Sequence, residues 1–173
     1  TTLEAQGYET AAMHPNKGSN WKRTSAYELL NFDTFYTIDD FDDDAETIRG
    51  HISDRANYEK IIEVINSKES SDQPFFLFDV TMQNHGGYSQ STLKGYEPDV
   101  KLNYETEYPE AQTYLSLARE SDKAFQNLVE YFEKVDEPTM IVMFGDHWPK
   151  LEEGFLAEVL GKDREKLDLL KAR

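Results

Sequence analysis

Three short, strand-like runs of this sequence are each followed by a loop that carries a histidine: His14, His85 and His147. In open α/β sheets, ligands bind beyond the carboxyl ends of the strands, so loops that follow neighbouring strands present their side chains to one ligand. We therefore expect these three histidines to converge on one cleft. His51, the fourth histidine, follows no such run and is expected to lie elsewhere.

The last of these histidines stands next to an acid. In "IVMFGDHWPK", residues 141–150, an apolar run ends at Gly145, and Asp146 and His147 follow side by side. A carboxylate oxygen and an imidazole nitrogen suit Zn²⁺ or Mn²⁺, although two ligands do not complete a metal site. The alternative is structural, with Asp146 capping a helix beside a packed histidine. Spacing alone leaves both interpretations open.

The charge balance restricts the partners of the chain. Its 173 residues include 18 basic and 34 acidic ones, which gives a formal net charge of −16. Such a field repels nucleic acid and does not draw the chain to an anionic membrane, so chemistry on phosphates requires a local basic pocket or a bound metal. The absence of cysteine excludes disulfides, thiolate metal sites and cysteine nucleophiles.

The apolar patterning predicts an α/β fold with a mostly parallel sheet flanked by helices. "FFLFDVTM", residues 75–82, is almost uninterrupted in its apolar character, which is typical of a strand covered on both faces. A second such run, "TMIVMFGDH" at 139–147, is predicted to be its parallel neighbour, because a long helix beginning at Pro109 connects the two. Further strands are predicted at 8–13 and 34–38.

No internal repeat or linker divides the chain, so residues 1–173 are interpreted as part of one domain. A helix capped by Ser53 or Asp54 is predicted, as are one or two short amphipathic helices in the C-terminal tail. Residues 86–108 are predicted to form a long loop of a type that is often functional. The apolar runs are far shorter than the roughly 20 residues of a membrane helix. A start without methionine indicates an excised fragment or a processed product.

Three motifs taken together resemble one family: "MHPNKGSNWKR" from residue 13, "TMQNHGGY" from residue 81 and "GDHWP" from residue 145. In this order they are similar to the motifs of the lipoteichoic acid synthase family, within the sulfatase and alkaline phosphatase superfamily. The resemblance extends from Thr1 to about Leu160. It implies a sulfatase-like or alkaline phosphatase-like fold, with residues 1–173 as the C-terminal part of one catalytic domain.

The function that the resemblance implies is that of a phosphoglycerol transferase. Such an enzyme takes glycerol phosphate from phosphatidylglycerol through a covalent threonine intermediate and adds it to a growing lipoteichoic acid-type chain. The implied location is the extracellular face of the cell membrane of a Gram-positive-type bacterium, with the membrane anchor upstream of this sequence. A divalent metal is also implied, with Mn²⁺ as the first choice and Zn²⁺ or Mg²⁺ as alternatives. The expected partners are phosphatidylglycerol and the glycerol phosphate chain, and nucleic acid is not among them.

The resemblance also assigns roles to individual residues. Asp146 and His147 match the metal ligands of the family, and His85 matches its active-site histidine. The residues that match those holding glycerol phosphate are His14, Trp21, Arg23 and His85. The chemistry agrees, because a planar guanidinium binds a phosphoryl group through two hydrogen bonds and an imidazole exchanges a proton with a reacting oxygen.

The sequence departs from the family pattern in one respect. The family's threonine nucleophile and a glutamate ligand of its metal come from sequence upstream of everything present here. The chain alone is therefore expected to be inactive and to bind divalent metal poorly. Thr81 lies in the matching "TMQNH" motif, but it is interpreted as a strand residue and not as the nucleophile.

Other functions stay open at this stage. A sulfatase or a phosphoethanolamine transferase of the same superfamily is the near alternative, which the Trp21 and Arg23 pocket disfavours. A non-catalytic domain that binds glycerol phosphate is an alternative of a different class. Taken singly, His14 or His85 would be a packed or surface histidine, Trp21 a core residue and Arg23 a solvated charge, so the hypothesis depends on the joint pattern.

Overall fold

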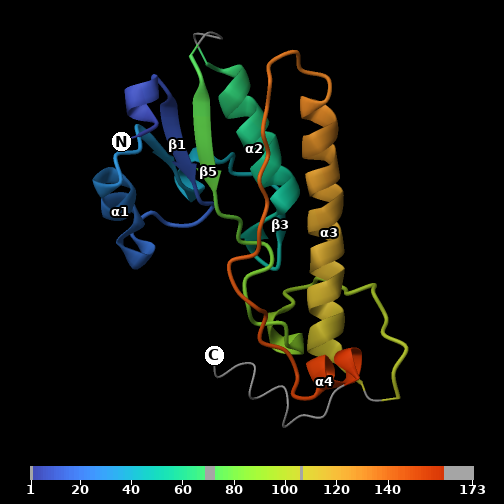
Figure 1. Ribbon diagram of the computed structural model, residues 1–173. Coiled ribbons are helices and arrows are strands. Elements are labelled where there is room, and N and C mark those ends of the chain that lie inside the picture. The colour runs from blue at the N-terminus through green and yellow to red at the C-terminus, as the bar shows by residue number, and fades with distance from the viewer. Residues whose placement is uncertain (1, 69–72, 106, 162–173) are drawn as a thin grey trace. The chain divides into compact units, whose positions relative to one another are not determined.

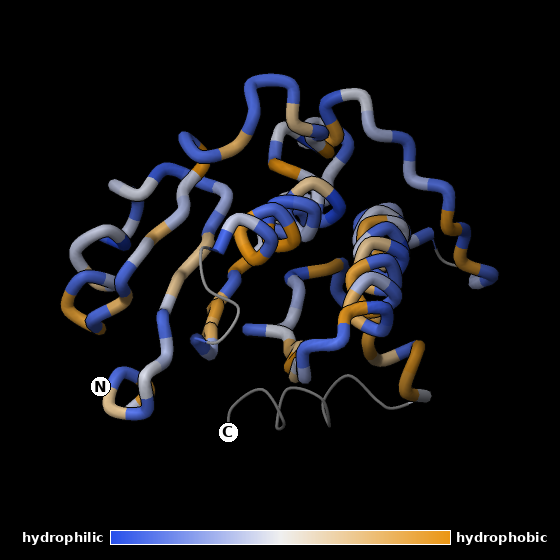
Figure 2. The backbone as a smooth tube through the Cα atoms, turned by 90° about the horizontal axis from the view of Figure 1, so that it is seen from above, coloured by the Kyte–Doolittle hydropathy of each residue, from blue (hydrophilic) through white to orange (hydrophobic). Residues whose placement is uncertain are grey.

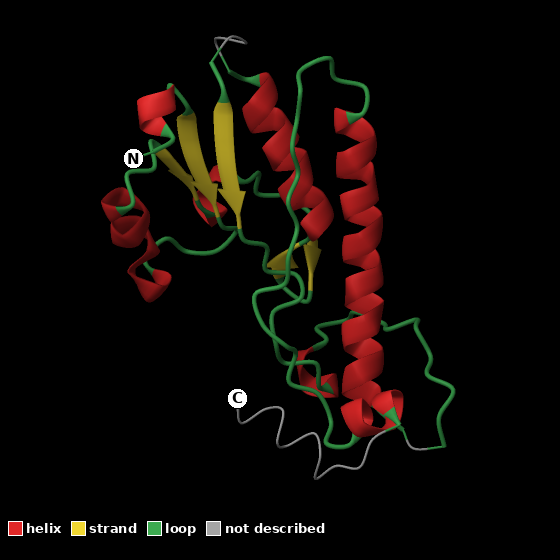
Figure 3. Cartoon of the chain, viewed as in Figure 1, coloured by secondary structure: helices red, strands yellow, loops and turns green. Residues whose placement is uncertain are grey.

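The computed structural model in Figure 1 describes most of the chain, namely residues 2–68, 73–105 and 107–161. The chain divides into two compact units. The first comprises Thr1–His85 and Glu120–Ile141, and the second comprises Gly86–Arg119 and Val142–Arg173. All the strands belong to the first unit, and the second consists of helices and long loops in its described part (Figure 3).

The first unit is built on a parallel sheet of three strands in the order β2-β1-β5, with β1 at Glu9–Met13, β2 at Thr34–Tyr36 and β5 at Phe75–Asp79. Met13, the last residue of β1, is in register with Tyr36 and with Asp79. The carboxyl ends of the three strands are therefore level, and the loops that follow β1 and β5 begin at the same edge of the sheet. These strands confirm the ones predicted from the three corresponding runs.

Helices cover both faces of this sheet, as the alternation along β5 shows. Phe75 and Leu77 pack on a core shared with α2 (Asp54–Asn66) and the second half of α3 (Pro109–Phe132). On the other face, the ring of Phe78 lies 6.5 Å from that of Tyr27 in α1 (Arg23–Leu29). In Figure 2, hydrophobic and hydrophilic residues interleave along α2 and α3, as in amphipathic helices. The predicted α/β class and its flanking helices are confirmed.

The run at 139–147 does not form the predicted strand. Residues 139–145 have no regular structure, and Met140, Val142 and Phe144 are 88%, 72% and 72% exposed. Within the described ranges β5 pairs with β1 alone, so the prediction of a parallel neighbour at 139–147 is wrong. The physical reason is that a strand requires hydrogen-bonding partners along its length, and an apolar run does not specify which strand supplies them.

A small antiparallel hairpin precedes α2. Its strands are β3 (Thr47–Ile48) and β4 (His51–Ile52), and the turn between them consists of Arg49 and Gly50 with φ angles of 56° and 75°. Two successive residues with positive φ are typical of a tight two-residue hairpin turn. Glycine adopts this conformation without penalty, whereas it is uncommon for arginine.

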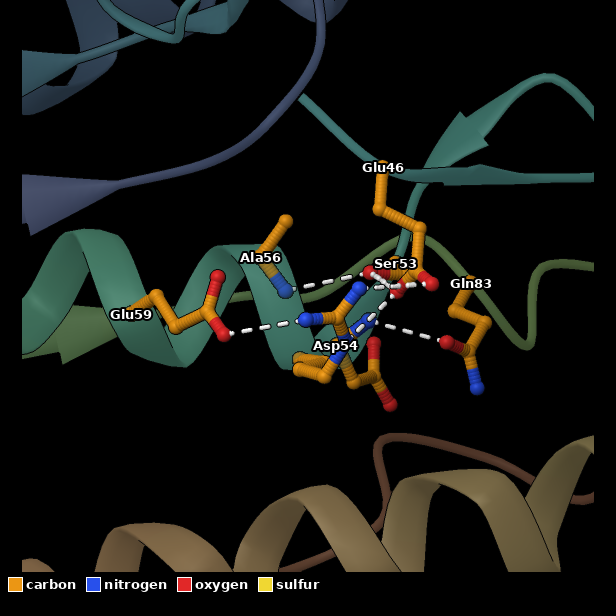
Figure 4. Close-up of polar contacts among 7 residues, drawn as sticks. Glu46, Ser53, Asp54, Ala56, Glu59 and Gln83 are labelled. Atoms are coloured by element: carbon orange, nitrogen blue, oxygen red, sulfur yellow. Dashed lines mark hydrogen bonds and ion pairs between the residues drawn. The ribbon is translucent and has the colours of Figure 1, made fainter. Parts of the chain in front are cut away.

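Glu46 attaches this hairpin to the first turn of α2 (Figure 4). Its carboxylate accepts a hydrogen bond of 2.6 Å from Ser53 Oγ and forms an ion pair of 2.7 Å with Arg55. Ser53 is also the helix cap, because its hydroxyl accepts a hydrogen bond from Ala56 N at 3.0 Å. The same residue thus confirms the predicted start of α2 and fixes the position of the hairpin.

The described residues of the first unit also include three short 3₁₀ helices, namely η1 (Glu4–Gln6), η2 (Asn20–Lys22) and η3 (Ile38–Asp40). The second unit holds the first half of α3, the predicted long loop 86–108 with η4 (Gln90–Thr92), and α4 (Phe155–Leu160). In the tail, α4 confirms one of the predicted short helices, and residues 162–173 lie outside the described residues. None of the helices described is long and apolar enough to cross a bilayer.

Candidate active site

His14 lies at the centre of the edge where β1 and β5 end. It is fully buried, and its Nδ1 hydrogen-bonds to the carbonyl oxygen of Val80 at 2.7 Å, which links the loops after the two strands. Burial lowers the pKa of His14, the hydrogen bond to Val80 opposes this, and the charges of Arg23 and His85 lower the pKa further. The imidazole is therefore neutral at neutral pH. With Nδ1 as the donor to the carbonyl, Nε2 is an acceptor.

Trp21 and Arg23 follow in the loop after β1. Trp21 is 89% exposed and has a φ of 55°, so it is not the core residue that a lone tryptophan would suggest. Arg23 begins α1 and is half-buried, with one guanidinium nitrogen 3.5 Å from the carbonyl oxygen of Asn20. Its charge contributes to the lowered pKa of His14. The structure thus presents an indole ring to solvent two residues before Arg23.

His85 lies in the loop after β5 and is exposed. Its backbone N–H donates to Met82 O at 3.0 Å, which closes a turn, and its carbonyl oxygen lies 3.4 Å from a guanidinium nitrogen of Arg49. The charge of His85 also contributes to the lowered pKa of His14. His14, Arg23 and His85 thus all lie in or just beyond the loops that begin where β1 and β5 end, and the hydrogen bond from His14 to Val80 O joins these two loops.

His51 was expected to lie away from the other histidines, but the structure places it beside His85. Its ring centroid lies 6.0 Å from that of His85, with an interplanar angle of 51°. The β3–β4 hairpin brings it there. The available signal was the Arg49-Gly50 pair between two short β-prone segments, which marks a hairpin but does not indicate what the hairpin packs against.

Asp146 and His147 belong to the second unit, so their approach to the other site residues stays a prediction. Asp146 Oδ2 lies 3.4 Å from His147 Nε2, and the two side chains are 77% and 74% exposed. One oxygen and one nitrogen donor side by side fit part of a Mn²⁺ or Zn²⁺ shell. Within the described part of the chain, no group of three or more histidine, aspartate or glutamate side chains forms a metal site.

Two carboxyl groups are buried directly behind this edge of the sheet. Asp54, 2% exposed, accepts hydrogen bonds from Ser121 Oγ at 2.5 Å and from the side chain of Thr81. Asp79, at the end of β5, accepts one from Asn57 Nδ2 at 2.6 Å. Thr81 was interpreted as a strand residue, but β5 ends at Asp79 and Thr81 lies in the loop that follows it. Burial raises the pKa of both carboxyl groups, and the nearby Asp54 adds to the effect on Asp79, whose pKa is raised to about 7.

Replacing Asp79 by asparagine is expected to flatten the pH dependence of stability. The pKa of Asp79 rises from 3.8 to about 7 on folding, so between these values the folded chain holds a proton that the unfolded chain has released. Stability therefore falls as the pH rises through this window, by about 1.4 kcal/mol per pH unit at most for one group. Asp79→Asn removes this contribution. Urea unfolding from pH 4 to pH 8 measures the free energy of unfolding, and Asp122→Asn, at an exposed position, is the control. A pH slope in Asp79→Asn equal to that of the wild type would contradict the raised pKa of Asp79.

Comparison with known proteins identifies relatives over almost the entire chain. The family model described as Sulfatase matches residues 1–170. A putative cyclic β-1,2-glucan modification protein of Rhizobium meliloti is 30% identical, over 99% of this chain and 27% of that protein. Lipoteichoic acid synthase 1 of Bacillus subtilis is 27% identical, over 92% of this chain and 25% of that protein. The chain thus spans about a quarter of the length of these curated relatives.

Solved structures show the same fold. The lipoteichoic acid synthase LtaP from Listeria monocytogenes matches with a TM-score of 0.63 and 22% identity, over 76% of this chain and 31% of that one. The Streptococcus pyogenes phosphoglycerol transferase GacH, solved in complex with sn-glycerol-1-phosphate, matches with a TM-score of 0.58 and 25% identity, over 76% of this chain and 34% of that one. Both likenesses agree with the sheet and helices described above.

Proposed function

The chain belongs to the sulfatase family, and on this premise we propose that it is part of an extracellular, metal-assisted phosphoglycerol transferase. The donor is phosphatidylglycerol, and glycerol phosphate passes through a covalent threonine intermediate to a polymer at the outer face of the cell membrane. The observation that carries the proposal is that His14, Arg23 and His85 follow the level ends of β1 and β5, whose loops are joined by the hydrogen bond from His14 to Val80 O. The relatives that are lipoteichoic acid synthases and a phosphoglycerol transferase support it.

Each of these side chains has a distinct role in the proposed reaction. The guanidinium of Arg23 holds the oxygens of the transferred phosphoryl group. The imidazole of His14 is neutral and donates from Nδ1 to Val80 O, and its Nε2 is buried, so the proposed hydrogen bond from a glycerol hydroxyl to Nε2 requires the loops over this nitrogen to move. The exposed ring of Trp21 packs on the glycerol carbons. His85 gives a proton to the departing diacylglycerol oxygen and later takes one from the acceptor hydroxyl.

A divalent metal completes the proposed site, and Asp146 and His147 would hold it. Mn²⁺ is the first choice for an oxygen and nitrogen donor set, with Zn²⁺ or Mg²⁺ as alternatives. Such an ion supplies positive charge to the phosphoryl oxygens. In the proposed enzyme the nucleophilic threonine and a further carboxylate ligand are outside these 173 residues. These residues alone are therefore expected to be inactive and to bind metal weakly.

Two acceptors are compatible with this chemistry. A glycerol phosphate chain of the lipoteichoic acid type follows from the likeness to the synthases. A polysaccharide is the second candidate, because two relatives are described as a glucan modification protein and a capsular polysaccharide biosynthesis protein. In both cases the donor half-reaction is the same, and His14, Arg23 and His85 act on the donor.

Labelled donor lipid tests the proposal directly. The full-length protein in vesicles with Mn²⁺ is given phosphatidylglycerol labelled in its head group, with either a glycerol phosphate chain or a β-glucan as the acceptor. Release of diacylglycerol and transfer of label to one acceptor are expected. Parallel reactions with phosphatidylethanolamine and with an aryl sulfate ester test the other two chemistries of the superfamily. Turnover of either compound without release from phosphatidylglycerol would reject the proposed donor.

A further inference from the structure

The β3–β4 hairpin adds two basic side chains to the edge of the sheet that carries His14, Arg23 and His85. Arg49 is 5% exposed, and one of its guanidinium nitrogens lies 3.4 Å from the carbonyl oxygen of His85. Two residues later, the ring of His51 lies 6.0 Å from that of His85. In a chain with a net charge of −16, this edge gathers the guanidinium groups of Arg23 and Arg49 and the N–H donors of the imidazoles of His51 and His85. Its natural ligand is an anion.

The relative position of the two imidazoles fits one shared oxygen atom. With an interplanar angle of 51°, the rings of His51 and His85 are tilted and do not stack. A hydrogen bond to oxygen spans about 2.9 Å between heavy atoms, so a 6.0 Å centroid separation leaves room for an oxygen that accepts from one nitrogen of each ring. Both rings are accessible to a ligand, because His51 is half-buried and His85 is exposed.

Side-chain contacts attach the hairpin to the first turn of α2. Ser53, which follows β4, hydrogen-bonds to Glu46 through its hydroxyl at 2.6 Å, and Arg55 forms an ion pair with the same carboxylate. On the other side of the turn, Arg49 contacts the backbone of His85 and so positions the loop that carries this histidine. Arg49 does this from a backbone conformation that is unfavourable for its residue type, with a φ of 56°.

We propose that His51 is a substrate-binding residue that hydrogen-bonds to the same phosphoryl oxygen as His85. This inference rests on the proposed function for the identity of the ligand, which is a glycerol phosphate ester. His51 binds the phosphoryl group in the ground state and in the transition state alike. Its removal therefore weakens binding and leaves the chemical step nearly unchanged.

Two substitutions at His51 and one control test the inference in the full-length protein. His51→Phe keeps the ring and removes both nitrogens, and His51→Asn keeps an N–H donor. Thr47→Val, at an exposed position of the same hairpin, is the matched control. Binding of sn-glycerol-1-phosphate is measured by calorimetry, release of diacylglycerol gives kcat and KM, and thermal melting reports the fold of each variant.

His51→Phe is expected to raise the Kd and the KM by roughly 10- to 100-fold, because it removes one hydrogen bond to a charged group. The kcat is expected to change by less than about threefold. His51→Asn is expected to recover most of the affinity, and Thr47→Val to match the wild type. Wild-type affinity in a folded His51→Phe protein would overturn the inference, as would a folded His51→Asn protein as weak as His51→Phe. If the wild type binds the ester in a His51-dependent way but releases no diacylglycerol, the proposed transfer fails and the binding role stands.

Discussion

Replacing His85 by alanine in the full-length protein is expected to lower the rate of diacylglycerol release from phosphatidylglycerol by roughly 100- to 1000-fold. In the proposed reaction His85 exchanges a proton with the oxygens that leave and attack, and this interaction is realised mainly in the transition state. The loss should therefore appear in kcat. His85 is exposed and lies in a loop after β5, so the substitution removes little packing.

His85→Gln separates proton transfer from binding. The amide still donates a hydrogen bond to a phosphoryl oxygen but does not exchange a proton, so its affinity for sn-glycerol-1-phosphate should stay near that of the wild type while its kcat stays as low as that of His85→Ala. Thermal melting of both variants is the control for the fold. Turnover at the wild-type rate by either variant would show that His85 does not exchange the proton.

Replacing Arg23 by alanine is expected to have an effect of the same order, roughly 100- to 1000-fold in kcat/KM. The guanidinium is the half-buried positive charge beside His14, where the proposed phosphoryl group binds. Arg23→Lys keeps the charge but loses the two-pronged geometry, so it should recover only part of the activity.

Lys22 provides the matched control for this loss of charge. It is the preceding residue, is exposed, and has a φ of 53°, a conformation that asparagine tolerates. Lys22→Asn removes one positive charge from the same loop. It is expected to leave kcat/KM within about threefold of the wild type, because at physiological ionic strength a solvated charge interacts only weakly with a bound ligand. Equal losses in Lys22→Asn and Arg23→Ala would mean that general electrostatic attraction, and not a specific contact, accounts for the effect.

These measurements distinguish a binding domain from an enzyme. A non-catalytic glycerol phosphate-binding domain would lose affinity on Arg23→Ala and would show no release of diacylglycerol in any variant. A transferase would show turnover that depends on His85 and on Arg23. The comparison uses the same proteins and ligands in both cases, so the two hypotheses are tested by one set of experiments.

The sequence by itself determined the features that depend on neighbouring residues. Ser53 was predicted as a possible cap of α2 and Pro109 as the start of α3, because a helix end is decided by local hydrogen bonding and by the fixed φ of proline. The unbroken apolar run at β5 predicted a strand covered on both faces, and Phe75 and Phe78 do face opposite layers of the unit. The motifs also pointed to the family, which the match over residues 1–170 confirms.

The tertiary structure alone decided which distant segments meet. The residues around His51 do not indicate that a hairpin brings it to His85, 34 positions away. The sequence likewise does not indicate that Asp54 is buried close enough to Asp79 to raise the pKa of Asp79. The run at 139–147 has the composition of β5 but no strand to pair with among the described residues. The physical reason is common to all three cases: composition and periodicity specify how much surface a segment buries, whereas its partner is set by hydrogen bonds and packing between residues that the chain brings together only on folding.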